Sequence, residues 1–272
     1  IMEFVRARGS SKQARRVERA RAKAGRKNSL RALDRLTEVH DGRRRITPDP
    51  PLVTRLDDTI LSAELDRAIA FFDSYRASLP VDKRTLVDRY TLVDLAVKVV
   101  GVGSVGTRCL IALIESGDGD PLFLQLKEAV PSVLEAHLGP SAFDHPGERV
   151  VQGQRLVQGT SDTFLGWASY QGQRGEVDFY VRQLWDGKLS APVDEMGTKR
   201  LTAYAHLCGV TLARAHARSG DAAAITGYLG DDDTFDRAIG TFAMAYADLD
   251  EHDHAAHLAA IDDGRIDAVR DI

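Results

Sequence analysis

The feature that most constrains the fold is a cluster of glycines near the middle of the chain. Residues 98–129 read KVVGVGSVGTRCLIALIESGDGDPLFLQLKEA, in which Gly101, Gly103 and Gly106 have the spacing G-x-G-x-x-G. Glycines at this spacing allow the backbone to close around a phosphate group. Two structures use such a loop. A helix follows it in a dinucleotide-binding turn, whereas a second strand follows it in a flap over a nucleoside triphosphate.

The dinucleotide-binding alternative fits the spacing of the motif. A strand over residues 95–100 would run into the glycines, and a helix over residues 105–116 would end before Gly117. A second strand over residues 122–126 would end near Glu128, about where an acidic residue holds a ribose. On spacing alone, this alternative predicts a dinucleotide-dependent oxidoreductase.

The flap alternative requires a strand on each side of the loop. Residues 109–114, CLIALI, suit a strand as well as a helix, and SGDGD at residues 116–120 is a strong turn signal. In the strand that follows, Phe123, Gln125 and Lys127 share one face, which places Lys127 beneath the glycine loop, where it can hold phosphates. A Rossmann fold also needs further alternating strands and helices, and the later sequence supplies helices instead. The topology therefore favours the flap.

The order of elements predicts an α+β protein. Residues 57–79, 82–88, 132–138 and 147–158 have helical patterns, residues 164–167 and 177–184 resemble strands, and residues 201–217, 222–228, 234–250 and 254–260 are again helical. We divide the chain into a basic helical arm (1–45), a helical segment (46–89), a small sheet lobe with the glycine-rich loop (90–188) and a helical lobe (189–272).

Composition limits the class of protein. Apolar residues make up 43% and charged residues 28% of the chain, and only two cysteines occur. No apolar run approaches the ~20 residues that span a bilayer. We therefore expect a protein of the reducing cytoplasm with no membrane partner.

Charge is distributed unevenly along the chain. The first 45 residues contain 15 Lys and Arg against 5 Asp and Glu, whereas the remainder contains 21 against 35. A basic arm can bind nucleic acid through phosphate contacts, but stacking on bases requires aromatic side chains, and none interleave with the arginines of residues 5–38. We therefore interpret the arm as a solvated helix or as a helix that docks on an acidic surface of the same protein, and not as a nucleic-acid contact.

Several segments support a family resemblance. KVVGVGSVGTRCLIALI, DPLFLQLKEAVPSVLE, RVVQGQRLVQGTSDTFLGW, FYVRQL and LARAHARSGD together resemble a bacterial family known as domain of unknown function 2252. The resemblance covers nearly the whole chain, from the basic arm to the C-terminus. That family in turn resembles the fold of protein kinases and aminoglycoside phosphotransferases, with its parts in permuted order. The resemblance implies a kinase-like fold, in which a small antiparallel sheet bears a glycine-rich hairpin loop and the remainder is mainly helical.

The resemblance also implies a nucleotide site with ATP as its cofactor. The phosphate flap is then formed by Gly101, Gly103, Ser104 and Gly106. Lys127 is the lysine that holds the phosphates, and Glu135 is its acidic partner. Glu148 competes with Glu135, because it follows the lysine at an interval nearer to that of kinases. Residues 177–188 correspond to the last strand and the hinge that receives adenine. In one departure from kinases, Arg108 stands where a valine packs on adenine.

The catalytic half of a kinase site is not found in the sequence. The resemblance implies a Gly-Asp-x-His…Asn segment and an Asp-Phe-Asp segment, and neither occurs; the one asparagine is Asn28, in the basic arm. The nearest substitutes are His216 and Asp221 at the end of a helix, although a capping or salt-bridging role is the better interpretation of these two residues.

We therefore expect a truncated, phosphotransferase-related protein that holds the nucleotide and is catalytically incomplete. Mg²⁺ and turnover would require the missing N-terminal segment as a partner, and the acceptor stays open. The alternative from another class is an inactive interaction or regulatory module that uses the basic arm (1–45) as its contact.

Overall fold

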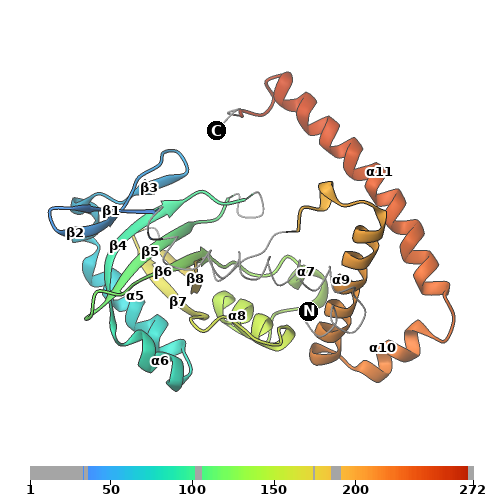
Figure 1. Ribbon diagram of the computed structural model, residues 1–272, viewed down its shortest axis with the longest axis horizontal. Helices are drawn as coiled ribbons and strands as arrows, with labels where there is room; N and C mark the ends of the chain where they lie inside the picture. The colour runs from blue at the N-terminus through green and yellow to red at the C-terminus, as the bar shows by residue number, and fades with distance from the viewer. Residues whose placement is uncertain (1–32, 34–35, 102–105, 174, 185–190, 269–272) are drawn as a thin grey trace. The chain divides into compact units, whose positions relative to one another are not determined.

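The computed structural model describes residues 33, 36–101, 106–173, 175–184 and 191–268. They form an α+β protein built on a six-stranded antiparallel sheet, with the strand order β3-β4-β5-β6-β8-β7 (Figure 1). The strands are β3 (Val53–Arg55), β4 (Tyr90–Lys98), β5 (Cys109–Ser116), β6 (Pro121–Glu128), β7 (Gly166–Gly172) and β8 (Gly175–Gln183). The expected α+β class with an antiparallel sheet is confirmed.

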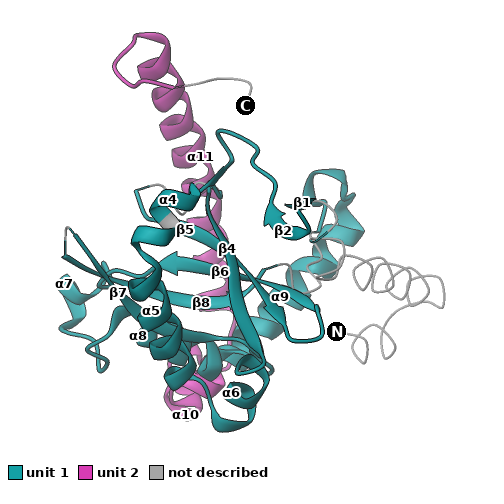
Figure 2. Ribbon diagram, turned by 90° about the vertical axis from the view of Figure 1, so that its left-hand side faces the viewer, with its two compact units in different colours: residues 1–215 teal, residues 216–272 magenta. Residues whose placement is uncertain are grey.

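The described helices agree with the sequence in most of their positions. They are α4 (Asp58–Ala63), α5 (Leu65–Ser78), α6 (Val81–Val87), α7 (Glu135–Leu138), α8 (Pro146–Val157), α9 (Thr198–Ser219), α10 (Ala222–Leu229) and α11 (Thr234–Asp262). The expected helix over residues 57–79 is two helices, and the two expected over 234–260 are one. The chain divides into two compact units, residues 1–215 and 216–272, and the second contains α10 and α11 (Figure 2).

Residues 109–116 form a strand, which decides between the two expectations for the glycine loop. Strand β5 is antiparallel to β4, with Leu110 opposite Val97 and Ala112 opposite Leu95. The turn after β5 is tight, because the N–H of Ser116 donates to the carbonyl of Asp120 at 3.0 Å. The prediction of a helix over residues 105–116, which a dinucleotide-binding turn requires, is therefore wrong. The strand predicted for residues 109–114 is confirmed.

The N-terminal arm is not helical up to residue 45. Strands β1 (Thr37–His40) and β2 (Arg43–Ile46) form an antiparallel hairpin in which His40 lies opposite Arg43. Its two-residue turn is Asp41 and Gly42, with φ values of 50° and 72°. Asp-Gly with both φ values positive is the preferred type I′ turn, because its twist matches that of the strands. This dipeptide signal corrects our expectation of a helical arm, and most of that arm lies outside the described residues. Strand β3 likewise interrupts the segment that we expected to be helical over residues 46–89.

Alternation along the strands gives the sheet two different faces. On one face, Phe71 and Tyr75 of α5 pack on Ala112, Leu124 and Phe179. On the other face, a second cluster gathers around buried apolar side chains of β4, β5, β6 and the N-terminal hairpin: Leu33, Leu36, Ile46, Val53, Ala96, Ile111, Leu113, Phe123 and Leu184. The sheet is therefore covered on both sides over much of its area.

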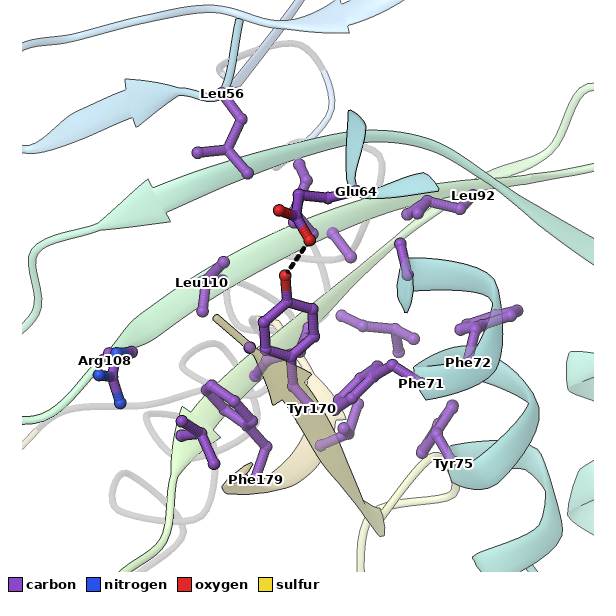
Figure 3. A pocket seen from close by; sticks show the side chains of 18 of the residues that line it. Leu56, Glu64, Phe71, Phe72, Tyr75, Leu92, Arg108, Leu110, Tyr170 and Phe179 are labelled. Atoms are coloured by element: carbon purple, nitrogen blue, oxygen red, sulfur yellow. Dashed lines mark hydrogen bonds between the residues drawn. The ribbon is translucent and has the colours of Figure 1, made fainter. Parts of the chain in front are cut away.

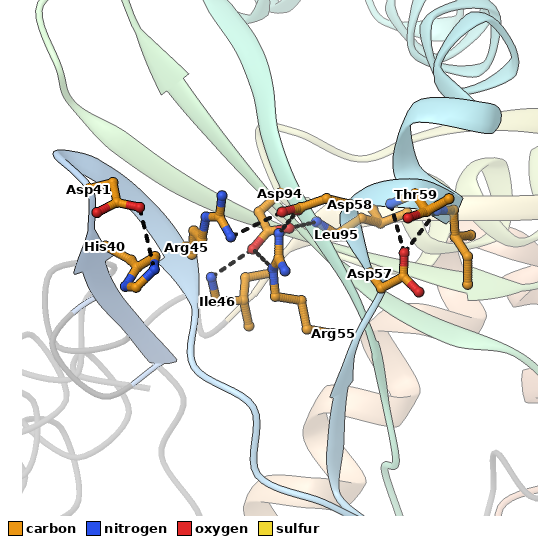
Figure 4. Close-up of polar contacts among 11 residues, drawn as sticks. His40, Asp41, Arg45, Ile46, Arg55, Asp57, Asp58, Thr59, Asp94 and Leu95 are labelled. Carbon is orange, nitrogen blue, oxygen red and sulfur yellow. Dashed lines mark hydrogen bonds and ion pairs between the residues drawn. The ribbon is translucent and has the colours of Figure 1, made fainter.

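A buried carboxylate ties the N-terminal hairpin and β3 to this sheet (Figure 4). Asp94 on β4 is only 1% exposed. One of its oxygens accepts hydrogen bonds from the N–H of Ile46 at 2.8 Å and from Nε of Arg55 at 2.8 Å, and the other accepts from the N–H of Leu95 at 2.9 Å. Arg55 also contacts Asp58, the first residue of α4. The buried charge is thus paired and hydrogen-bonded, as a stable interior carboxylate must be.

Candidate functional site

Lys127 lies on β6 at the end of the sheet next to the glycine loop. In register it stands opposite Cys109 on β5 and opposite Tyr180 on β8. Residues directly opposite in neighbouring antiparallel strands share a face. Lys127 therefore points to the same side of the sheet as Cys109 and Tyr180, which is the side away from α5.

Two further cations share this side. Lys98 follows Val97, the partner of Leu110, and so lies beside Cys109. Arg182 is opposite Gln125 and donates to its side-chain oxygen from Nε at 3.2 Å. We call the surface formed by Lys98, Cys109, Lys127, Tyr180 and Arg182 the lysine face. It brings three positive charges together on neighbouring strands at the end of the sheet near the loop, and such an arrangement attracts an anion.

Cys109 reports on the environment of the lysine face. Burial raises the pKa of its thiol, and the positive charges of Lys127, Lys98 and Arg182 act in the opposite direction. Its sulfur accepts a hydrogen bond from the side-chain amide of Gln125 at 3.5 Å. The thiol is therefore protonated and packs as a small buried group beside the cations.

A polar cavity of about 340 Å³ adjoins Lys127. Its wall combines the residue after the last glycine of the loop, the end of β6, the segment that leads to α7, α8 and β8: Thr107, Lys127, Glu128, Ala129, Val130, Pro131, Ser132, Val133, Arg149, Val150 and Tyr180. Arg149 is held in place by a 2.9 Å hydrogen bond to the carbonyl of Val130. The cavity thus has basic side chains from two elements and lies at the foot of the glycine loop.

The stem of the glycine loop is fixed to the strand that bears Lys127. Gly106 has φ +80°, a conformation that suits glycine. Two residues later, the N–H of Arg108 donates to a carboxylate oxygen of Glu128 at 2.7 Å, and its guanidinium contacts the other oxygen at 3.1 Å. Of the expected flap residues, Gly101 and Gly106 are described and exposed, whereas Gly103 and Ser104 lie outside the described residues.

Arg108 lies on the opposite face of the sheet from Lys127. Because neighbouring residues of a strand point to opposite faces, Arg108 projects away from the lysine face and Cys109 takes the place beside Lys127. The side chain beside Lys127 at the foot of the loop is therefore that of Cys109.

The two candidate acidic partners of Lys127 lie on successive helices. Glu135 is in the first turn of α7, and its carboxylate accepts a 2.9 Å hydrogen bond from the N–H of Ser132, a residue that lines the polar cavity. Glu148 is in the first turn of α8 and contacts Gln152. Glu135 thus shapes one wall of the cavity, and its pairing with Lys127 stays a prediction.

Sequence reasoning missed a cluster that positions α8. His145 precedes the helix, and its Nδ1 accepts hydrogen bonds from the N–H groups of Gly147 at 2.9 Å and Glu148 at 3.3 Å. Its Nε2 lies 3.1 Å from the Ser169 hydroxyl and 3.2 Å from Asp178, and that hydroxyl donates to Asp178 at 2.6 Å. An Nδ1 that accepts leaves the proton on Nε2, so this histidine cannot take a proton from the serine. The cluster caps α8 and joins it to β7 and β8, and it is not a nucleophilic triad.

One candidate in the later helices, Asp221, has a structural role. The carboxylate of Asp221 accepts from the N–H groups of Ala223 and Ala224 and caps α10, as the sequence suggested. Of the expected last strand and adenine-binding hinge (177–188), residues 185–188 lie outside the described residues. Within the described part of the chain, no helix is long and apolar enough to cross a bilayer.

Comparison with known proteins gives one match. A model of the family described as "Uncharacterized protein conserved in bacteria (DUF2252)" matches residues 2–260, which is nearly the whole chain. No curated protein and no solved structure matches the chain.

Proposed function

The chain belongs to the bacterial DUF2252 family, and from this we propose that it is a kinase-like protein that binds ATP or ADP with the phosphates on the lysine face. The observation that carries the proposal is the position of Lys127. This lysine faces a polar cavity of about 340 Å³ at the foot of a glycine-rich loop between two antiparallel strands.

The order of the parts supports this role. Protein kinases cover the nucleotide phosphates with a glycine-rich loop and hold them with a lysine on the third strand of the small lobe. Here the loop connects β4 and β5, and Lys127 lies on β6, the next strand in sequence and in space. Helices α7 and α8 follow at once, and each begins with a glutamate in its first turn.

The charges on the lysine face favour phosphate over a neutral ligand. The charges of Lys98, Lys127 and Arg182 each lower the pKa of the Cys109 thiol, so all three lie close to it. Arg149 of α8 lines the polar cavity beside Lys127. A triphosphate carries several negative charges, and an anion that replaces water between such cations gains charge-assisted hydrogen bonds. We place the phosphates between the glycine loop and Lys127. The backbone that follows β8 then receives adenine.

The proposal concerns binding. Mg²⁺ would serve phosphoryl transfer when a catalytic Asp and Asn hold it between the phosphates, and the sequence motifs for those two groups are not found in this chain. What the residues of the lysine face supply is positioning of the nucleotide and neutralisation of its charge.

A second candidate function, that of an interaction module, has one observation in its favour. On α11, Ile239, Phe242, Tyr246 and Leu249 are each 49% to 60% exposed and follow the 3, 4, 3 spacing of a helix-pairing seam. An apolar stripe of this kind on a described helix suits a partner helix. Tight nucleotide binding on the lysine face would favour the first function over this one.

Thermal unfolding with and without nucleotide tests the proposed function. At about 100 times its dissociation constant, a ligand that binds only the folded state stabilises it by about 2.7 kcal/mol. We expect ATP and ADP to raise the melting temperature more than NAD does, and Lys127→Ala to abolish the rise. Lys83→Ala is the control, because Lys83 lies on α6 and pairs with the exposed Asp82. Equal shifts for Lys127→Ala and Lys83→Ala would contradict the proposal.

A further inference from the structure

A second cavity, of about 420 Å³, lies on the opposite face of the sheet from the lysine face (Figure 3). Helices α4 and α5 form one wall, and strands β4 to β8 form the other. We call it the aromatic cavity, after the rings of Phe71, Phe72, Tyr75, Tyr170 and Phe179 that line it. Its volume is in the range of about 300–1,000 Å³ that is typical of small-molecule sites.

The lining is apolar apart from Glu64, Tyr75, Arg108, Tyr170 and Gln173, and the first four of these make hydrogen bonds within the protein. The Tyr75 hydroxyl donates to the carbonyl of Phe164 at 2.7 Å. At the rim, the Tyr170 hydroxyl and the Arg67 guanidinium each lie 2.6 Å from the same oxygen of Glu64. Most of the wall therefore offers apolar contact, and Figure 3 shows Tyr170 pointing toward Glu64.

The charges at the rim select against an anionic ligand. Arg108 in the lining and Arg67 at the rim are both paired, with Glu128 at 3.1 Å and Glu64 at 2.6 Å, and Arg76, which lies over the Phe72 ring, pairs with Asp73 at 3.3 Å. A ligand carboxylate would lose its hydration without gaining an unpaired cation. It would also lie close to the charge of Glu64, which keeps one oxygen without a hydrogen-bond donor among the described residues. That oxygen suits a ligand hydroxyl, which donates a proton and carries no charge.

We propose that the aromatic cavity is a binding site for a neutral molecule with an elongated apolar body and a terminal hydroxyl that donates to Glu64. The apolar body contacts the rings of α5 and the aliphatic side chains of β4, β5 and β6. This site is separate from the proposed nucleotide site. The lining residues of the two cavities differ, and Arg108, which directly precedes β5, connects the aromatic cavity to the stem of the glycine loop through its backbone.

Displacement of the neutral fluorophore N-phenylnaphthylamine by decanol and by decanoate tests this assignment in the full chain. Both competitors have the same apolar chain, and at neutral pH only decanoate is charged. We expect decanol to displace the fluorophore at a concentration at least about tenfold lower than decanoate, because a buried, uncompensated charge costs binding energy. Equal potency of the two would overturn the choice of a neutral ligand.

Variants locate the binding. Ala68 lines the cavity from α5, so Ala68→Phe should fill it and weaken decanol binding by at least about tenfold. The control is Ala70→Phe on the exposed side of the same helix, which should bind as the wild type does. Should Ala68→Phe fail to fold, Leu56→Trp blocks the cavity from the segment before α4. Undiminished decanol binding by a folded blocking variant would overturn the assignment.

A third variant tests the polar end. Glu64→Gln removes the negative charge and leaves Arg67 without its partner. Decanoate should then gain affinity and approach decanol. An unchanged ratio between the two ligands would show that neither binds beside residue 64.

Discussion

The carboxylate of Glu128 holds both the backbone and the side chain of Arg108, at 2.7 Å from its N–H and 3.1 Å from its guanidinium. The N–H of Glu128 in turn donates to the carbonyl of Arg108 at 2.9 Å. These contacts fix the point at which the chain leaves the glycine loop, one residue from Lys127 on the neighbouring strand. The loop and the lysine are therefore positioned by the same pair of residues.

Removal of this carboxylate should loosen the stem of the loop without unfolding the protein. In Glu128→Ala we expect amide hydrogen exchange at Arg108 to accelerate by about tenfold or more, because a hydrogen bond to a charged acceptor contributes about 1.5–3 kcal/mol. Glu115→Ala removes the same charge at the opposite end of the β4–β5 hairpin and should leave exchange at Arg108 unchanged. Equal exchange rates in the two variants would show that Glu128 does not hold the stem.

Local sequence signals account for much of the sheet and for its candidate site. The alternation of residues 122–127 and the turn at residues 116–120 correctly placed β5, β6 and the orientation of Lys127. The dipeptide Asp41-Gly42 also indicates a hairpin turn, whereas the arginine-rich composition around it suggests a helix. A strong two-residue turn signal should have outweighed composition, because it fixes the backbone directly.

Contacts between distant parts of the chain could not be predicted. Asp94 meets Ile46 and Arg55 across 48 and 39 positions, and a lone aspartate in an apolar strand does not reveal such partners. The capping cluster of His145 and Ser169 spans 24 positions and has no local motif. The aromatic cavity likewise depends on how α4 and α5 dock on the sheet, which no single segment determines.

Two glycines of α8 should respond in opposite directions to alanine. A Cβ at Gly147 would lie 2.4 Å from the carbonyl oxygen of Phe179, so Gly147→Ala should force α8 away from β8 and destabilise the protein by about 1–3 kcal/mol. A Cβ at Gly153 meets nothing within 4 Å, so Gly153→Ala should stabilise the helix by up to about 1 kcal/mol. Urea unfolding of both variants checks this, and a stable Gly147→Ala would contradict the described docking of α8.

The buried carboxylate on β4 should be among the residues most sensitive to substitution. Asp94→Asn removes the charge that compensates Arg55 and should lower the free energy of unfolding by about 3–5 kcal/mol. Asp73→Asn breaks an exposed pair with Arg76 and should change it by less than about 1 kcal/mol. Chemical denaturation of the two variants gives the comparison. Similar small losses would mean that the network around Asp94 contributes little to stability.

Tyr75 should make the protein sensitive to alkali. Burial raises the pKa of its hydroxyl above the ordinary value of 10.0. Above that pH the unfolded chain loses this proton while the folded chain keeps it, so stability falls as pH rises, by about 1.4 kcal/mol per unit from this group. Tyr75→Phe should lose stability at neutral pH but show a shallower decline between about pH 10 and pH 11. Parallel declines for variant and wild type in urea unfolding would contradict this role.

The claim that Lys127 contacts nucleotide phosphates is tested most directly by an acyl phosphate of ATP. In this reagent a lysine amine beside the phosphates attacks the acyl carbon, a C–N bond forms, and ATP leaves. Peptide mass spectrometry of the labelled protein should find the acyl group on Lys127, and excess ADP should suppress it, while the half-buried Lys83 on α6 reacts weakly and without regard to ADP. Labelling of Lys127 that ADP does not reduce, or that is no stronger than that of Lys83, would contradict the account.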